Sequence, residues 1–199
     1  MEEHRSKFLE LIVASANQHK IDEIQEMMPP EIQLLSLKDI GMLDDIPETA
    51  TTLEGNASLK AKHVFDKLGK DCFGEDTGLE VFALEMEPGV YSARYAGPER
   101  STDANVSKVL EKLKIHRNRN AQFRTVICLI LKGKEYFFEG LVKGNIAYEK
   151  YGTGGFGYDP IFIPDGYEQT FGELSVEIKN KISHRAEAVK KMMFFIKNL

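Results

Sequence analysis

The stretch from Phe123 to Lys150 constrains the fold more than any other part of this 199-residue chain. Its sequence, FRTVICLILKGKEYFFEGLVKGNIAYEK, has two apolar and aromatic runs separated by the short polar segment Lys132-Gly133-Lys134. This pattern predicts a hairpin of two long antiparallel strands that turns at the polar segment. The hairpin would supply the antiparallel part of a larger sheet.

Strand and helix patterns alternate in the first part of the chain. Apolar runs at 9–14 and 32–37 predict strands, and helical spacing between them predicts a helix that ends at Pro29-Pro30. Another helix is expected to follow a capping box formed by Thr51 and Glu54. Its expected buried residues are Leu53, Ala57, Ala61, Val64, Phe65 and Leu68.

The remaining segments extend this alternation. The segment DCFGEDTGLEVFAL predicts a strand pair with a break at Gly78, and a helix is expected around Val106 to Leu113. Residues 159–171 are expected to be irregular, and a final amphipathic helix begins near Ser183. No linker, repeat or low-complexity segment is evident. We therefore predict one α/β domain over residues 1–199, with a long mixed, largely antiparallel central sheet flanked by helices.

Charge and composition exclude several classes of protein. The formal net charge of −5 does not favour a nonspecific nucleic-acid binder. Cys72 and Cys128 match neither a disulfide framework nor a zinc spacing, so we expect reduced core cysteines. The segment FLELIVASA superficially resembles a signal-peptide core, but Glu10 and the charge-balanced residues before it favour a buried strand. No run is long enough for a membrane helix, and a cytoplasmic location is the simplest expectation.

Several charged residues stand where they suggest a site for an anion and its metal ion. Asn17 is a good N-cap, and Lys20 would lie in the first turn of a helix, where the dipole disfavours a cation unless an anion is near. GEDTG places two carboxylates between glycines, at the expected end of a strand, and such oxygens suit Mg²⁺. A solvated lysine and a structural Asp-Thr-Gly turn are the alternatives. Five acids and no base lie between Asp39 and Glu54, and this acidic segment could equally be a solvated loop; the five are Asp39, Asp44, Asp45, Glu48 and Glu54.

The glycine-rich stretch YGTGGFGYDP, residues 151–160, is not a phosphate-binding P-loop. It lacks the lysine and the Ser/Thr that follow the P-loop glycines, and no helix start is expected after it. Its glycines would instead allow Phe156 and the Tyr158-Asp159 pair to approach a base and sugar, with ordinary turn chemistry as the alternative. Further along, His184 and Arg185 would be cations at the start of the last helix.

Six motifs occur in order along almost the whole chain: ASANQHK, TLEGNASLKAK, GEDTGLEVFAL, PGVYSARYAG, GTGGFGYDPIF and ELSVEIKNKISHR. In these motifs the chain closely resembles the inosine triphosphate pyrophosphatase family, also described as noncanonical purine NTP pyrophosphatases. The resemblance implies two lobes with a cleft between them, and hydrolysis of ITP, dITP and XTP to the monophosphate and pyrophosphate. It also implies Mg²⁺ as cofactor, with Mn²⁺ as a possible substitute, and a homodimer.

The resemblance also assigns roles to individual residues. Glu48 and Asp76 match metal-binding acids, and Asp76 also matches the proton acceptor. Thr77 occupies a substrate-contacting position that is commonly serine. The implied phosphate contacts are Ser15, Asn17, Lys20 and Lys60. The implied base-side contacts are Phe156, Gly157, Tyr158, Asp159, Lys179, His184 and Arg185.

Some features depart from the family pattern. Glu75 replaces the aspartate that commonly precedes the catalytic one, which leaves open whether Glu75 or Asp76 reaches the metal directly, and Gly55 replaces a common acid. We favour Asp76, because it is still followed by a hydroxyl residue and a glycine, as in the family pattern. Two other functions stay open: a Maf-like pyrophosphatase acting on other triphosphates, and a catalytically silent nucleotide-binding module.

Overall fold

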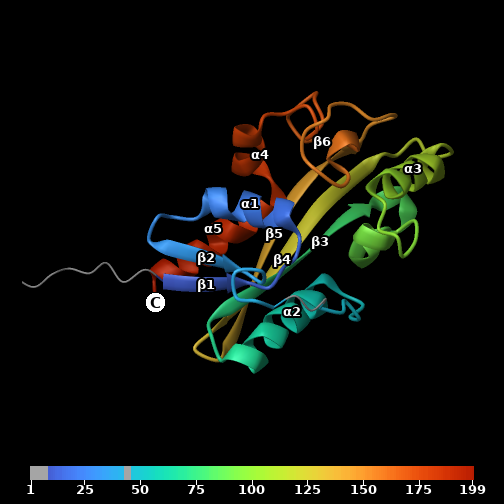
Figure 1. Ribbon diagram of the computed structural model, residues 1–199. Coiled ribbons are helices and arrows are strands. Elements are labelled where there is room, and N and C mark those ends of the chain that lie inside the picture. The colour runs from blue at the N-terminus through green and yellow to red at the C-terminus, as the bar shows by residue number, and fades with distance from the viewer. Residues whose placement is uncertain (1–8, 43–45) are drawn as a thin grey trace, which may run out of the picture.

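A computed structural model describes residues 9–42 and 46–199 and shows a six-stranded sheet in the order β2-β1-β3-β4-β5-β6 (Figure 1). β1 pairs in parallel with β2 and β3, and every other pairing in this sheet is antiparallel. The expected mixed, largely antiparallel sheet is therefore confirmed. The strands are β1 (Leu9–Val13), β2 (Ile32–Ser36), β3 (Cys72–Val81), β4 (Asn120–Leu131), β5 (Lys134–Ile146) and β6 (Phe162–Pro164).

Helices cover both faces of this sheet. The α-helices are α1 (Gln18–Met27), α2 (Leu53–Leu68), α3 (Thr102–Leu113), α4 (Val176–Ile182) and α5 (His184–Lys197), and the 3₁₀ helices are η1 (Phe82–Leu84), η2 (Gly89–Arg94) and η3 (Asp159–Ile161). The irregular segment expected at 159–171 is wrong in part, because it contains η3 and β6. Helix α4 was not predicted, since seven residues are too few to show helical periodicity.

The predicted hairpin is confirmed as β4 and β5, which stay in register from Leu131↔Lys134 to Asn120↔Asn145. The two residues between the strands, Lys132 and Gly133, have φ values of 50° and 76°. Positive φ at both central residues matches the turn that the right-handed twist of a hairpin favours.

The predicted break at Gly78 is wrong, because β3 is one continuous strand paired with β4 from Cys72 to Val81. Asp76 therefore lies in the middle of a strand, and the expected strand end at GEDTG is also wrong. Gly78 is needed for close packing instead: a Cβ atom there would lie 2.6 Å from the carbonyl oxygen of Gly89.

Two details of α2 also differ from expectation. Its N-cap is Thr52, whose side chain accepts a hydrogen bond from the Gly55 amide, so the capping box at Thr51 is wrong. Leu68 is 40% exposed rather than buried, because it ends the helix just before the left-handed C-cap Gly69. Of the five acids in the preceding segment, Asp44 and Asp45 lie outside the described residues.

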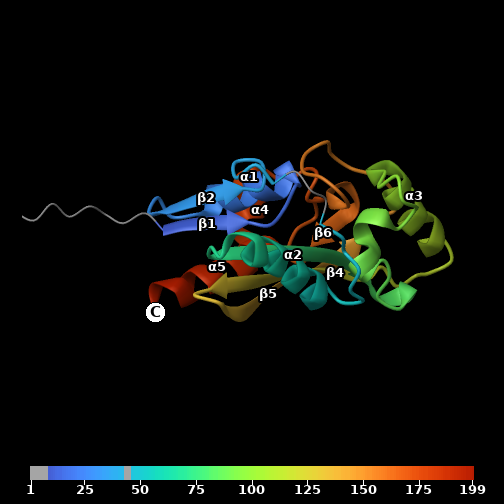
Figure 2. The same ribbon diagram turned by 60° about the horizontal axis from the view of Figure 1, so that its bottom comes forward.

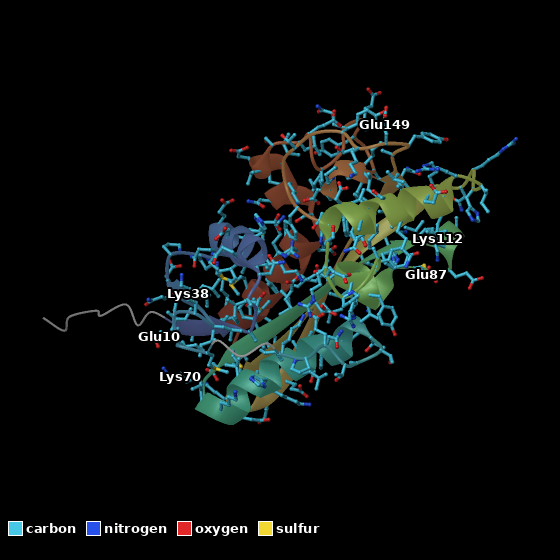
Figure 3. All side chains as sticks on the ribbon, turned by 45° about the vertical axis from the view of Figure 1, so that its right-hand side comes forward. Glu10, Lys38, Lys70, Glu87, Lys112 and Glu149 are labelled. Carbon is cyan, nitrogen blue, oxygen red and sulfur yellow. The ribbon has the colours of Figure 1, made fainter. Side chains whose placement is uncertain are left out.

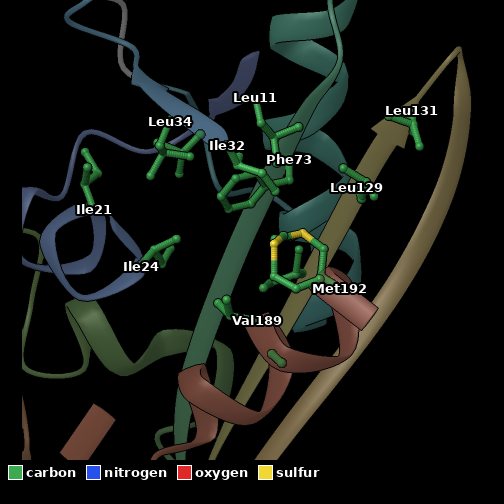
Figure 4. Close-up of a cluster of buried hydrophobic side chains, with 14 residues drawn as sticks. Leu11, Ile21, Ile24, Ile32, Leu34, Phe73, Leu129, Leu131, Val189 and Met192 are labelled. Carbon is green, nitrogen blue, oxygen red and sulfur yellow. The ribbon is translucent and has the colours of Figure 1, made fainter. Parts of the chain in front are cut away.

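Side chains alternate between the two faces of the long strands. Ile127, Leu129 and Leu131 point toward α1 and α5, and they join the cluster drawn in Figure 4. Val126, Cys128 and Ile130 point the other way and pack with α2 and Cys72. Both cysteines are free and buried, as expected, and burial raises the pKa of each thiol to about 12. This alternation decides which neighbours each residue of β3 meets.

A third apolar cluster lies at the other end of the sheet, where α3, η3 and β6 gather (Figure 2).

Charged side chains such as Glu10, Lys70 and Glu149 lie on the outer surface, where Lys112 forms an ion pair with Glu87 (Figure 3). Over the described part of the chain, no helix combines the length and apolar character that crossing a membrane would require.

Candidate active site

The cleft begins where β1 ends. β1 pairs with β3 only at Cys72 and Phe73, so the following residues of β3 have no β1 partner. A cavity of about 440 Å³ lies here, between the loop after β1, α2, η2, the glycine-rich loop and the start of α5. All the site residues expected from the sequence line it: Ser15, Asn17, Lys20, Glu48, Lys60, Asp76, Thr77, Phe156, Gly157, Tyr158, Asp159, Lys179, His184 and Arg185.

The two adjacent acids of β3 have different surroundings because consecutive side chains point to opposite faces of a strand. Asp76 meets Lys60 and Asn56 of α2, whereas Glu75 meets Arg185 of α5. Glu75 is 1% exposed and does not belong to the cavity lining. Asp76 is therefore the acid that a ligand in the cavity would meet.

Lys60 connects two carboxylates in the acidic wall of the cavity. Its Nζ atom lies 2.5 Å from Glu48 Oε1 and 2.9 Å from Asp76 Oδ1, and Asn56 Nδ2 donates to Asp76 Oδ2 at 3.1 Å. Burial alone would lower the pKa of Lys60, but Asp76 and Glu48 outweigh it and raise that pKa. The close contact depends on Gly74 of β3, because a Cβ atom there would lie 2.1 Å from the Ala57 carbonyl oxygen of α2.

The donor set of this wall fits a divalent metal ion. Glu48 and Asp76 already converge on one cation, the ammonium of Lys60. Among residues 9–42 and 46–199, no three His, Cys, Asp or Glu side chains gather as a complete metal cluster. Mg²⁺ does not need such a cluster, because one or two carboxylates with water and substrate phosphates are its usual ligands.

The first turn of α1 adds a cationic corner, formed by Lys20, to the same cavity. Asn17 is the N-cap, as predicted, with its Oδ1 accepting from the Lys20 amide at 3.3 Å, and Ser15 Oγ accepts from the Asn17 amide at 3.1 Å. Lys20 Nζ lies 3.1 Å from Glu75 Oε2. Burial lowers the pKa of Lys20, and Glu75 opposes this effect. Glu75 thus supplies the anion that a cation at a helix N-terminus requires.

Arg185, at the start of α5, is 1% exposed and held by two acids. Its Nη2 and Nε atoms donate to Glu75 Oε1 at 2.9 and 3.2 Å, and Nη1 donates to Glu23 Oε2 at 2.5 Å. Burial alone would raise the pKa of Glu75, but Arg185 and Lys20 outweigh it and hold this pKa well below its usual range. Nη2 also donates to Thr77 Oγ1 at 3.2 Å, which brings Arg185 to the cavity wall.

His184 is not the cation that was expected from the sequence. Burial, with Arg185 and Lys179 adding to it, lowers the pKa of His184 well below its usual value. The imidazole stacks on Phe123 with ring centroids 4.6 Å apart, and its Nδ1 has no hydrogen-bond partner. At neutral pH the ring is therefore neutral and offers one N–H donor.

The pKa of His184 makes a prediction for stability. Because its folded pKa is depressed, the unfolded chain binds the proton first as the pH falls below about 6.5, the usual value for histidine. We expect His184 to remove up to about 1.4 kcal/mol of unfolding free energy per pH unit below that value. Urea unfolding of wild type and His184→Asn between pH 7.5 and 5.5 measures this slope. Equal slopes in the two proteins would contradict a neutral buried His184.

The glycine-rich loop presents Phe156 to the cavity. Asp159 Oδ2 accepts from the Phe156 amide at 2.7 Å and from Lys179 Nζ at 2.6 Å. Gly155 has a φ of 69°, and a Cβ atom there would lie 2.1 Å from Asp159 Oδ2, so only glycine fits. The Phe156 ring stacks on His19 of α1, with centroids 5.4 Å apart and planes inclined by 13°.

Sequence reasoning assigned no role to several residues that build this site. Asn56 holds Asp76, Glu23 joins Lys179 and Arg185 at 2.6 and 2.5 Å, and Arg94 binds Glu48. Asn56 and Arg94 lie within TLEGNASLKAK and PGVYSARYAG, so the motifs contained them. Their partners are distant in sequence, and only the folded chain shows the contacts.

The fold and the cavity define a class of protein: an α/β protein with a cleft that combines acids for a cation, cations for an anion and an aromatic wall. Comparison with known protein families gives the same class: the chain matches the model of the Ham1 family over residues 11–195. The chain belongs to the Ham1 family, and the family resemblance seen in its motifs is confirmed.

Individual relatives agree with this assignment. A protein of Flavobacterium johnsoniae named dITP/XTP pyrophosphatase is 56% identical, over 93% of this chain and 96% of its own. One of the same name from Porphyromonas gingivalis is 51% identical, over 94% and 96%. The solved Ham1 protein of Staphylococcus aureus has a TM-score of 0.86 at 41% identity, covering 95% of this chain and 98% of its own. That of Coxiella burnetii has a TM-score of 0.88 at 36% identity, covering 96% and 100%.

Proposed function

We propose that this protein hydrolyses noncanonical purine nucleoside triphosphates, such as dITP, ITP and XTP, to the nucleoside monophosphate and pyrophosphate. The observation that carries the proposal is that three surfaces line one cavity. They are an acidic wall formed by Glu48 and Asp76, a cationic corner formed by Lys20, and an aromatic wall formed by Phe156. The names of the relatives described above support the same substrate class. The resemblance also leads us to propose a homodimer, which sedimentation analysis would test.

In this reaction a water oxygen bonds to the α-phosphorus, and the bond from that phosphorus to the bridging oxygen breaks. Pyrophosphate leaves with the electron pair, and Asp76 accepts the proton of the water. Lys20 and Lys60 would pair with phosphate oxygens, and Ser15 and Asn17 would orient them. Mg²⁺, held by Glu48 and Asp76 when bound, would neutralise charge on the phosphate oxygens, with Mn²⁺ as a substitute.

Base selection is proposed to involve Arg185, His184 and Phe156, which line the same cavity. Hypoxanthine and xanthine carry a 6-keto oxygen, whereas adenine carries an amino group there. A buried N–H donor rejects an analogue that cannot accept from it. Arg185 and neutral His184 both supply such donors, beside the Phe156 ring. Arg185 carbon Cζ lies 5.5 Å from the centre of that ring, which places donor and stacking surface together.

A substrate panel tests the proposal. We expect pyrophosphate release from ITP, dITP and XTP to exceed that from ATP, dUTP and TTP in the presence of Mg²⁺. Equal rates on pyrimidine triphosphates would favour a Maf-like enzyme instead. No release from any of them, together with measurable ITP binding, would indicate a silent nucleotide-binding module.

Replacing Phe156 with alanine tests the stacking surface. Loss of base stacking is expected to weaken ITP binding by about 1–3 kcal/mol. Calorimetric titration of Asp76→Asn protein with and without this substitution gives the difference in the absence of turnover. Phe137→Ala, on an exposed part of β5, is the matched control. Unchanged ITP affinity in the Phe156 variant would reduce the loop to ordinary turn chemistry.

A further inference from the structure

The two proposed metal acids are supported differently by the backbone. Asp76 is in the centre of β3, paired with Val126 of β4, so the sheet fixes it. Glu48 belongs to the segment 46–50, which has no regular secondary structure. The position of its carboxylate must therefore be set by contacts with other side chains.

Arg94 makes the contacts that can do this. Its Nη1 atom donates to Glu48 Oε2 at 3.0 Å, and its Nη2 atom donates to the main-chain oxygen of Glu48 at 3.1 Å. One planar guanidinium thus holds both the carboxylate and the backbone of the same residue. A lysine ammonium is a point charge and cannot reproduce this rigid fork.

Arg94 is itself attached to the strand that carries Asp76. It ends η2, where Ser92 Oγ accepts from the Leu79 amide of β3 at 2.9 Å and donates to the Gly89 carbonyl oxygen at 2.6 Å. The close approach of Gly78 and Gly89 fastens the same two segments. Tyr158 of the glycine-rich loop donates its hydroxyl to the Ser92 carbonyl oxygen at 2.8 Å.

The two oxygens of Glu48 have different partners. Oε1 contacts Lys60, which also contacts Asp76. Oε2 contacts Arg94 and not Lys60. A metal ion held by Glu48 and Asp76 would compete with Lys60 for these two carboxylates. Arg94 could keep Oε2 and the backbone in place during this exchange, because it lies on the other side of the carboxylate.

We propose that Arg94 is a positioning residue that sets Glu48 opposite Asp76 for a divalent cation. The inference rests on the proposed function, because it takes Glu48 and Asp76 as the metal acids. Arg94 acts through Glu48 and does not itself belong to the cavity lining. Loss of Arg94 should therefore weaken metal binding. Removal of a residue that holds a metal ligand typically lowers metal affinity by about 10- to 100-fold.

The test measures Mn²⁺ binding directly, by electron paramagnetic resonance of the free ion, in the presence of a non-hydrolysable ITP analogue. We expect Arg94→Lys and Arg94→Gln to raise the Kd for Mn²⁺ by about 10- to 100-fold. Arg117→Lys, which alters an exposed arginine outside the cavity, should leave it unchanged. In the activity assay, raised Mg²⁺ should restore the kcat of Arg94→Lys. Wild-type affinity in both Arg94 variants would overturn the inference.

A double-mutant cycle separates positioning from a general effect on folding. Glu48→Gln should weaken Mn²⁺ binding, and adding Arg94→Lys to it should cause no further loss, because Arg94 acts only through Glu48. Independent, additive losses would overturn the inference even if one variant were unstable. Wild-type protein that binds Mn²⁺ but hydrolyses no ITP would refute the proposed function and leave the Mn²⁺ comparison of the variants intact.

Discussion

Asp76→Asn is expected to lower kcat for ITP hydrolysis by about 10²–10⁴-fold, because an amide cannot accept the proton of the attacking water. The substitution is nearly isosteric, and the structure places Asp76 against Lys60 and Asn56. The asparagine oxygen can accept a hydrogen bond from Lys60 or from Asn56, but the amide NH₂ group then faces the other donor. We therefore expect nucleotide binding to persist with a modest loss of stability.

Single-turnover rates and calorimetric titration with ITP separate these two effects. Glu80→Gln is the matched control, since it removes one carboxylate charge from β3 outside the cavity. An Asp76→Asn protein with wild-type turnover would refute the catalytic role. Loss of turnover in Glu75→Gln alone would transfer that role to its neighbour, although Glu75 lies outside the cavity lining.

Arg185→Ala is expected to lower the free energy of unfolding by about 3–5 kcal/mol, because it removes one partner from a buried ionic network. Arg185 is held by Glu75 and Glu23, and both acids would lose a buried cation. The preference for ITP over ATP is also expected to fall in this variant. ITP should lose about 1–3 kcal/mol of binding from a missing charged hydrogen bond, whereas ATP should lose less.

Urea unfolding and paired kcat/KM values for ITP and ATP measure the two losses. Lys191→Ala, on the same helix, removes an exposed i,i+4 pair with Glu187 and should cost no more than about 0.5 kcal/mol. Equal losses on ITP and ATP would move Arg185 from base selection to phosphate binding or folding. Unchanged stability would contradict the ionic network that surrounds it.

The parts of the fold predicted well are those with local causes. The turn at Lys132 and Gly133, the Asn17 cap and the helix start at Ser183 each depend on a few adjacent residues. Some predictions that required neighbours across the fold failed. Gly78 suggested a break, but β3 stays paired with β4 on both sides of Gly78, and η2 packs against the glycine.

The site divides in the same way. The motifs were enough to name residues that the fold gathers around one cavity, because the family resemblance assigned each residue by its place in a motif. Their charge states and orientations could not be predicted. His184 is neutral because burial, with Arg185 and Lys179 nearby, lowers its pKa, and this burial depends on Phe123 and the rest of the packed core.

The sequence by itself determined the alternation of strands and helices, the long hairpin, the family and the residues of the candidate site. Only the tertiary structure decided how those residues divide their work. It turned Asp76 toward the cavity and Glu75 toward Arg185, and it brought Arg94 to Glu48. The physical reason is that propensities and caps act between near neighbours in the chain, whereas ion pairs and desolvation depend on residues that only packing brings together.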